Sequence, residues 1–335
     1  MEPVHLPNPT TYAIPAFILL IIAEMLIARV KDRSRFETRD TLTSLALGLG
    51  STVAGILTGG FVIAMAVWAY QYRLFDIGYV WWAWIACFVL DDLAYYAFHR
   101  SAHRVRWFWA AHVIHHSSQH YNLSTALRQT WTGFIALTFL FRMPLFFIGF
   151  PVEMVIFVGG LNLIYQFWIH TEAIKRMPRW FEAVMNTPSH HRVHHATNPQ
   201  YLDANYAGVF IIWDKMFGSF VPERDDEKIN YGIVKNLGSF NILWAALHEW
   251  VGIAKDVWRA PTLAAKWNYM VKPPGWSHDN SRDTSETIKA RWQERQDAIE
   301  QAKELAKKQE STEAWNPMTS SSSEEDPQAV PPQAA

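Results

Sequence analysis

The chain has 335 residues, enough for one large domain or two ordinary ones. Half of the residues are hydrophobic, 18% are charged and the formal net charge is −1, which excludes a mostly disordered chain and argues against a nucleic-acid partner. A single cysteine, Cys87, excludes an internal disulfide and a cysteine-rich zinc or iron–sulfur site.

Long apolar runs in the first half of the chain predict membrane spans. Residues 13–28 form the first run, with Glu24 as its only charged residue, and no Lys or Arg precedes it as a signal peptide would require. Residues 42–70 and 79–98 form two more runs, and each approaches or exceeds the roughly 20 residues that cross the hydrocarbon core of a bilayer. Two short spans, or a hairpin that enters the bilayer in part, are predicted within residues 131–170. These runs argue against a soluble all-helical protein.

Basic residues predict the orientation of the spans. Lys and Arg concentrate in residues 29–39 and 100–128, whereas the alternate loops hold only Arg73 and Arg142. Because short loops rich in Lys and Arg stay in the cytoplasm, both basic segments and everything after residue 171 are predicted to be cytoplasmic. The chain shows no evident retrieval signal, which favours a bacterial inner membrane over the endoplasmic reticulum.

Histidines in three tight clusters give the strongest functional signal. The clusters HRSAH, HVIHH and HRVHH contain His99 and His103, then His112, His115 and His116, and then His191, His194 and His195. Residues three and four apart share one face of a helix, so each cluster presents its imidazoles together. Eight imidazoles exceed what one ion needs and suit two ions with four or five ligands each. His170 in WIHTE is a further candidate ligand, while His120 is as readily a surface residue.

Acidic residues near these clusters are candidates for tuning the metal ligands. Asp92 lies seven residues before His99 in an apolar run, and its carboxylate is predicted to accept a hydrogen bond from the distal nitrogen of a ligating imidazole. Glu172 and Asp214 are weaker candidates for the same role. Asp91 falls on another face of the helix and is expected to pair with an arginine.

The order HxxxH, HxxHH and HxxHH across residues 80–225 resembles the fatty acid hydroxylase / sterol desaturase superfamily of membrane di-iron enzymes. Longer stretches, among them WFWAAHVIHHSSQHYNLSTALRQ and NTPSHHRVHHATN, resemble its alkylglycerol monooxygenase-like branch. The resemblance implies two iron ions, dioxygen and an external electron donor, either a separate protein or a diffusible reductant. Zinc would replace iron readily in a purified sample, because it binds such ligands more tightly than ferrous iron. Arg104 departs from the branch, which has an acid there that is linked to pterin use.

The predicted fold class is all-α: an integral-membrane helical bundle of about four or five spans with a cytosolic, histidine-rich helical cap. The predicted segments are N-terminal spans at 1–78, a fatty acid hydroxylase-like catalytic domain at 79–253, a charged cytosolic helical segment at 254–315 and a disordered tail at 316–335. The resemblance implies an oxygenase that hydroxylates the aliphatic chain of a lipid taken from the bilayer. Five aromatic residues are candidates to line its apolar slot: Phe98, Trp107, Trp109, Phe167 and Trp168.

Three alternative functions stay open. A lipid or sterol desaturase removes a second hydrogen in place of adding oxygen, and the same ligands serve both reactions. A zinc-dependent membrane hydrolase needs a bridging carboxylate or water and a general base, and acids are scarce within the clusters. A non-catalytic membrane protein would hold the metals and turn nothing over.

Overall fold

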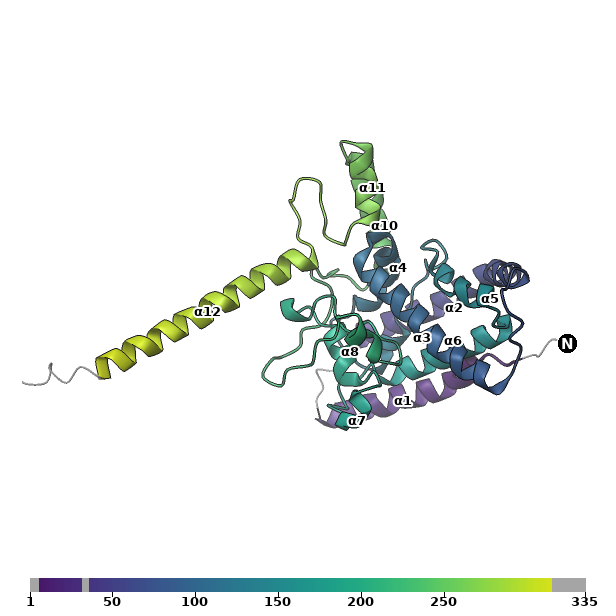
Figure 1. Cartoon of the computed structure of the whole chain (residues 1–335), viewed down its shortest axis with the longest axis horizontal. Coiled ribbons are helices and arrows are strands. Elements are labelled where there is room, and N and C mark those ends of the chain that lie inside the picture. The colour runs from purple at the N-terminus through teal and green to yellow at the C-terminus, as the bar shows by residue number, and fades with distance from the viewer. Residues whose placement is uncertain (1–5, 32–35, 315–335) are drawn as a thin grey trace, which may run out of the picture. The chain divides into compact units, whose positions relative to one another are not determined.

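The computed structural model describes residues 6–31 and 36–314, and these ranges form helices and loops with no β-strand (Figure 1). The chain divides into two compact units, Met1–Ile288 and Lys289–Ala335. All of the predicted histidine clusters fall in the first unit. The all-α prediction is therefore confirmed for the described residues, while the predicted tail at 316–335 lies outside them.

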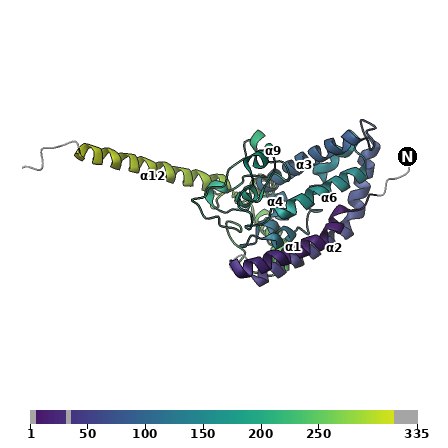
Figure 2. The ribbon, with the colours of Figure 1, turned by 90° about the horizontal axis from the view of Figure 1, so that it is seen from below.

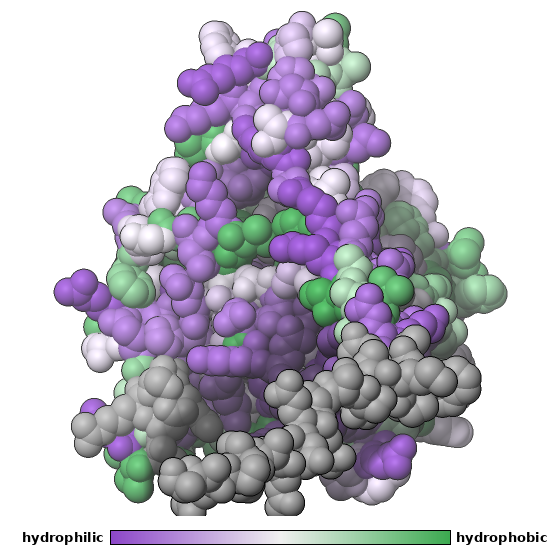
Figure 3. All heavy atoms as spheres, turned by 90° about the vertical axis from the view of Figure 1, so that its left-hand side faces the viewer, coloured by the Kyte–Doolittle hydropathy of each residue, from purple (hydrophilic) through white to green (hydrophobic). Residues whose placement is uncertain are grey.

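Two helices of the described chain are long and apolar enough to cross a membrane, α1 (Pro9–Lys31) and α2 (Thr38–Gln71). Both expose large apolar side chains along their length, for example Leu19 at 68% and Leu57 at 79% of its surface. A helix surrounded by water buries such side chains, so both helices are suited to contact with lipid. By contrast, Figure 3 shows a largely hydrophilic face of the molecule with hydrophobic residues in smaller patches.

The other predicted spans are not confirmed by the fold. The third forms α3 (Trp81–Arg104), which carries charged residues in its second half. The region predicted to hold two spans or a hairpin forms three shorter pieces: η3 (Thr138–Arg142), α5 (Met143–Ile148) and α6 (Val152–Trp168). Charges explain the difference, because Arg142 interrupts the run and its Nε donates to Asp91 on α3 at 2.6 Å. Figure 2 shows α3 and α6 running alongside each other.

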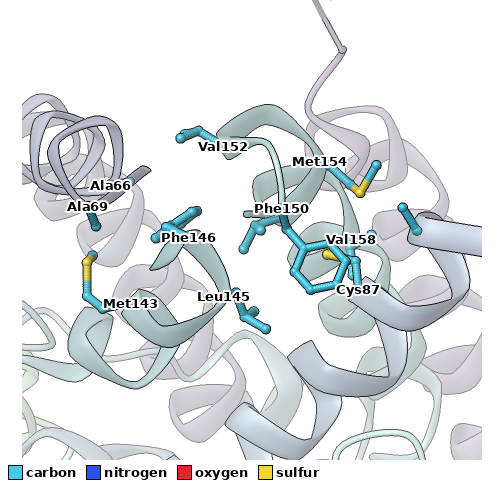
Figure 4. Packing of buried hydrophobic residues seen from close by; sticks show 12 residues of the cluster. Ala66, Ala69, Cys87, Met143, Leu145, Phe146, Phe150, Val152, Met154 and Val158 are labelled. Carbon is cyan, nitrogen blue, oxygen red and sulfur yellow. The ribbon is translucent and has the colours of Figure 1, made fainter. Parts of the chain in front are cut away.

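A buried apolar cluster joins α2, α3, α5 and α6 (Figure 4). Its most buried members include Ala69, Cys87, Phe150, Met154 and Val158. Gly149 closes the turn after α5 with a φ of +123°, and a Cβ there would collide with the carbonyl of Phe75, so only glycine fits. This packing fixes the direction of α3 and places the histidines at the end of α3 that lies away from the cluster.

A cap of short helices and loops surrounds the histidines. It consists of α4 (Arg106–His116), η2 (Leu123–Leu127), α7 (Arg179–Glu182), α8 (Pro188–His194), η4 (Pro199–Tyr201) and α9 (Ile212–Met216). Two later helices, α10 (Ile242–Arg259) and α11 (Leu263–Val271), complete the first unit, and the charged α12 (Ser285–Ala314) continues into the second.

Two buried acids on α1 and α2 tie the cap to these helices. Glu24, near the end of α1, accepts a hydrogen bond from the backbone N–H of Leu123 at 2.8 Å. Asp40, in the first turn of α2, accepts from Ser118 Oγ at 2.6 Å and from Arg128 Nη1 at 3.1 Å. The histidine-rich cap therefore lies at the end of α1 and the start of α2.

Candidate metal centre

Nine buried histidine side chains meet in two groups inside the first unit. The ligand nitrogens of each group lie within 4.8 Å of one another. The first group is His99, His103, His112, His116 and His194, and the second is His115, His170, His191 and His195. These are the nine histidines nominated from the sequence, and their role as metal ligands stays a prediction. His120 and His190 belong to neither group.

Each HxxHH motif contributes to both groups. On α4, His112 and His116 face the first group, whereas His115 faces the second. In the motif on α8, His194 faces the first group, whereas His191 and His195 face the second. Residues four apart on a helix point in nearly the same direction, while neighbours differ by roughly 100°. Adjacent histidines therefore diverge into the two groups.

The ring nitrogens converge as ligands of a common ion would. Neighbouring Nε2 atoms within each group are 2.9–3.2 Å apart. Four Nδ1 atoms donate to backbone carbonyls at 2.7–3.2 Å: His99 to Tyr206, His115 to Arg128, His170 to Gln166, and His194 to Ala204. A proton held on Nδ1 leaves the lone pair of Nε2 facing the centre of its group, which is the form that binds a metal.

Burial also keeps these imidazoles neutral. Loss of hydration lowers the pKa of His115 to about 4. Burial first, and neighbouring imidazoles second, hold the pKa values of His99, His116 and His191 well below the ordinary value for histidine. Neutral imidazoles are good ligands for first-row transition metals, and several facing lone pairs without a cation would repel one another. The donor set fits two metal ions, one with five and one with four nitrogen ligands.

Asp92 does not contact a histidine, so the predicted hydrogen bond to a ligating imidazole is wrong. Its carboxylate accepts hydrogen bonds at 2.8–3.0 Å from the backbone N–H groups of Val209 and Phe210 and from the side chains of Trp213 and Asn162. Asp92 lies two turns before His99 on α3, too far along the helix to reach that ring. It instead anchors the loop that follows Tyr206, whose carbonyl receives the His99 proton.

The other two predicted acids, Glu172 and Asp214, also form their hydrogen bonds with groups other than the histidine rings. Glu172 accepts from the hydroxyl of Tyr231 at 2.9 Å. Tyr231 stacks on Tyr121, and the ring of Tyr121 lies 5.2 Å from that of His195. Asp214 accepts from two backbone N–H groups at 2.8 Å, one of them that of Tyr206. The pairing of Asp91 with an arginine is confirmed, and its partner is Arg142.

Asp203, which the sequence analysis missed, is the acid that lies against a candidate ligand. Its Oδ1 is 3.4 Å from His103 Nδ1, and its Oδ2 is 4.0 Å from Arg104 Nε. Burial raises the pKa of Asp203, but hydrogen bonding from His103 and the charge of Arg104 outweigh it and hold the pKa below its ordinary value. No sequence motif identifies Asp203 as a site residue, because it lies in a loop with no histidine motif around it and its partner His103 is a hundred residues earlier.

Comparison with known proteins agrees with this arrangement. Residues 84–219, which include all nine histidines, match the fatty acid hydroxylase family. This match identifies residues 84–219 as a region of the fatty acid hydroxylase type. The chain is 38% identical over 284 residues to the alkylglycerol monooxygenase of Xenopus tropicalis, covering 84% of this chain and 61% of that protein. It is 37% identical over 283 residues to that of Homo sapiens, covering 83% and 62%.

More distant similarity extends to an ornithine lipid hydroxylase, OlsE of Rhizobium tropici, at 25% identity over 132 residues, 39% of this chain and 40% of that protein. The chain spans about three fifths of the length of the alkylglycerol monooxygenases that it matches. No solved structure matches it.

An apolar cavity of about 910 Å³ lies on the side of the first histidine group where Phe98 packs. Its walls are apolar side chains of α3, α4, η3, α5 and α11, among them Trp107 and Phe141. Phe98 links the cavity to the histidines, because its ring is 5.6 Å from that of Phe141 and 6.1 Å from that of His112.

The remaining aromatic residues predicted to line a slot lie elsewhere. Trp109 packs on His103, with 5.1 Å between ring centroids, and does not line the cavity. Phe167 stacks on Phe17 of α1, and Trp168 packs on Tyr165. Both residues are on α6, which contributes no residue to the cavity lining, so they serve helix packing.

Proposed function

We propose that this protein is a membrane-bound di-iron oxygenase that hydroxylates the aliphatic chain of a lipid, with dioxygen as oxidant and an external donor of electrons. The observation that carries the proposal is the convergence of nine buried imidazoles in groups of five and four beside an apolar cavity. The match of residues 84–219 to the fatty acid hydroxylase family, and the similarity to alkylglycerol monooxygenases, support iron as the metal and a lipid as the substrate.

The five imidazoles that include His99 would hold one iron ion, and the four that include His191 would hold the other. Bound there, the two ions would supply the activation of dioxygen that insertion into an unactivated C–H bond requires. Zinc fits the same nitrogen ligands, so zinc in a purified sample would not by itself indicate a hydrolase.

The protein's own contribution is to bind and position the lipid chain. The cavity walls are apolar, so they take an aliphatic chain and exclude water from it. Phe98 stands between the cavity and His112, and it would set how closely a carbon atom approaches the metal centre. Backbone carbonyls and Asp203 hold the imidazoles in fixed orientations, which keeps the site from rearranging as the substrate binds.

We infer that the protein is multi-pass, with α3, α5 and α6 completing the bundle begun by α1 and α2. The ties from Glu24 and Asp40 support a histidine centre near the membrane face, on the side of Arg29 in α1 and Arg39 in α2. By the positive-inside rule, we expect this side to be cytoplasmic. We further propose that the membrane is a bacterial inner membrane and not the endoplasmic reticulum. The electron donor is a separate protein or a diffusible reductant.

Two observations favour an oxygenase over a zinc-dependent hydrolase and over a non-catalytic metal-binding protein. Neither histidine group of the described chain includes a carboxylate, which a two-metal hydrolase would use as bridge or base. The apolar cavity next to the first group offers a site for a lipid substrate, which a non-catalytic metal-binding protein would not need. A desaturase would use the same residues, so only analysis of the reaction product distinguishes it from a hydroxylase.

Mass spectrometry of host lipids under isotopically heavy dioxygen tests the proposal, with and without expression of the protein. A lipid that gains one heavy oxygen supports a monooxygenase and identifies the substrate class. A lipid that only loses two hydrogens makes the protein a desaturase. The His112→Ala variant serves as the inactive control, and the His248→Ala variant, changed outside both groups, should behave as the wild type.

A further inference from the structure

The hairpin formed by α10 and α11 turns two acidic residues toward the protein and most of its large apolar residues outward. On α10, Glu249 and Asp256 accept hydrogen bonds from the buried guanidinium of Arg106 at 2.6 and 2.7 Å. The outward side carries apolar residues at helical spacing, all exposed or half-exposed: Leu243, Leu247, Val251, Ala254 and Trp258. A helix that faces water usually turns its large apolar side chains inward, so the outward side of this hairpin is suited to an apolar medium.

The second helix of the hairpin repeats the pattern. Leu263 and Trp267 lie one turn apart on α11, with 83% and 61% of their surfaces exposed. Ala265 and Tyr269 face inward and pack in a buried cluster with Ala260. Trp258, which is 87% exposed, lies near the end of α10, and Leu263 begins α11 on the other side of the turn. Large aromatic and aliphatic side chains are therefore gathered at the tip of the hairpin.

The hairpin begins at the end of a candidate membrane span. Ala245 and Ala246 of α10 pack against Leu47 near the start of α2, and Thr43 Oγ1 donates to the carbonyl of Phe240 at 3.4 Å. In Figure 1, α10 and α11 project crosswise to α1. A helix pair that leaves the end of a span in a crosswise direction runs along the membrane surface.

We propose that the α10–α11 hairpin is an interfacial anchor, lying in the headgroup region of the phospholipid bilayer on the side of the histidine groups. Its apolar side chains reach the acyl chains, and Lys255 and Arg259, exposed beside Trp258, face the lipid phosphates. The hairpin lies outside residues 84–219, so it is an addition to the part that matches the hydroxylase family.

The same hairpin forms part of the cavity wall. Trp267, Met270 and Val271 of α11 line the apolar cavity opposite side chains of α3. An anchor in the lipid headgroups would therefore open the cavity toward the bilayer, and a lipid chain would enter beside α11. This entry route rests on the proposed function, whereas the anchoring does not, since it follows from the exposed surface alone.

Depth-dependent fluorescence quenching tests the anchoring on the full-length, metal-loaded protein in phosphatidylcholine vesicles. Cys87 is fully buried, so a cysteine introduced as Trp258→Cys or Leu263→Cys can be labelled selectively with a polarity-sensitive fluorophore. Asp226→Cys, at an exposed position in the loop after α9, is the matched control. Interfacial helices place their apolar side at a depth of roughly 5–10 Å. Labels at positions 258 and 263 should be quenched by phospholipids brominated near the headgroup end of their acyl chains, and that at 226 by aqueous iodide.

Two results would overturn the proposal. Iodide quenching at positions 258 and 263 as strong as at 226 would place the hairpin in water. Shielding of both labels from iodide and from bromine would show that a second copy or another protein covers it. Because the measurement needs no turnover, it stands even if no lipid is oxidised. The entry route is tested separately by the double variant Trp258→Glu with Leu263→Glu, which should raise the KM for a bilayer lipid and leave metal content unchanged. An unchanged KM would refute that route.

Discussion

The Asp203→Asn substitution tests whether the carboxylate beside His103 orients that imidazole for metal binding. Asp203 has a φ of +52°, in the left-handed region that Asn tolerates as well as Asp does. The substitution therefore removes the charge and leaves the backbone unstrained. Removing such an outer partner lowers metal affinity about 10- to 100-fold. The separation of 3.4 Å is longer than a strong charge-assisted bond. We therefore expect the lower end, about tenfold or ~1.4 kcal/mol.

The loss should be confined to one of the two metals, because Asp203 contacts the first histidine group only. The metal content of each variant is measured by mass spectrometry at increasing concentrations of a chelator. In Asp203→Asn, one ion should be lost at a chelator concentration about tenfold lower than in the wild type. The other ion should be lost at the same concentration as in the wild type. Asp226→Asn, at an exposed position, is the control and should match the wild type. An Asp203→Asn variant that holds both metals as tightly as the wild type would refute this reasoning.

Four further predictions concern the metals, stability, pH and the cavity. His194→Ala should lower metal content and abolish turnover, and His248→Ala should do neither; full activity in the former would contradict the site. Asp40→Ala leaves the buried Arg128 charge unpaired and should lower the free energy of unfolding by roughly 3–5 kcal/mol, seen as a lower melting temperature in detergent. Because burial lowers the pKa values of clustered imidazoles such as His99 and His115, protons compete for these rings only well below the ordinary pKa of about 6.5; metal content after dialysis should hold down to about pH 5.5. The metal-free protein should instead lose stability as the pH falls through 6.5, where only the unfolded chain gains protons. Ala94→Trp fills the apolar cavity and should raise the KM for lipid without changing metal content; an unaffected KM would place the substrate elsewhere.

The sequence by itself determined which histidines gather and what kind of fold holds them. Periodicity is a local property, so the spacings HxxxH and HxxHH place imidazoles on shared helix faces without knowledge of the rest of the chain. The same holds for α1 and α2, whose apolar runs are long enough to be read without tertiary information. His170, alone in its segment, was identified through its setting in WIHTE, and it completes the second group.

Only the tertiary structure decided how these parts are combined. His115 and His116 belong to different groups because their rings meet different histidines of the motif on α8. These partners are up to 80 positions away in the sequence. Asp92 and Asp203 show the same limit: one binds a loop over a hundred residues later and the other reaches back a hundred residues to His103. Contacts between segments that are distant in the sequence arise from packing of whole helices, which local spacing does not encode. The face of α10 that turns outward likewise depends on ion pairs with Arg106, a residue more than a hundred positions earlier in the chain.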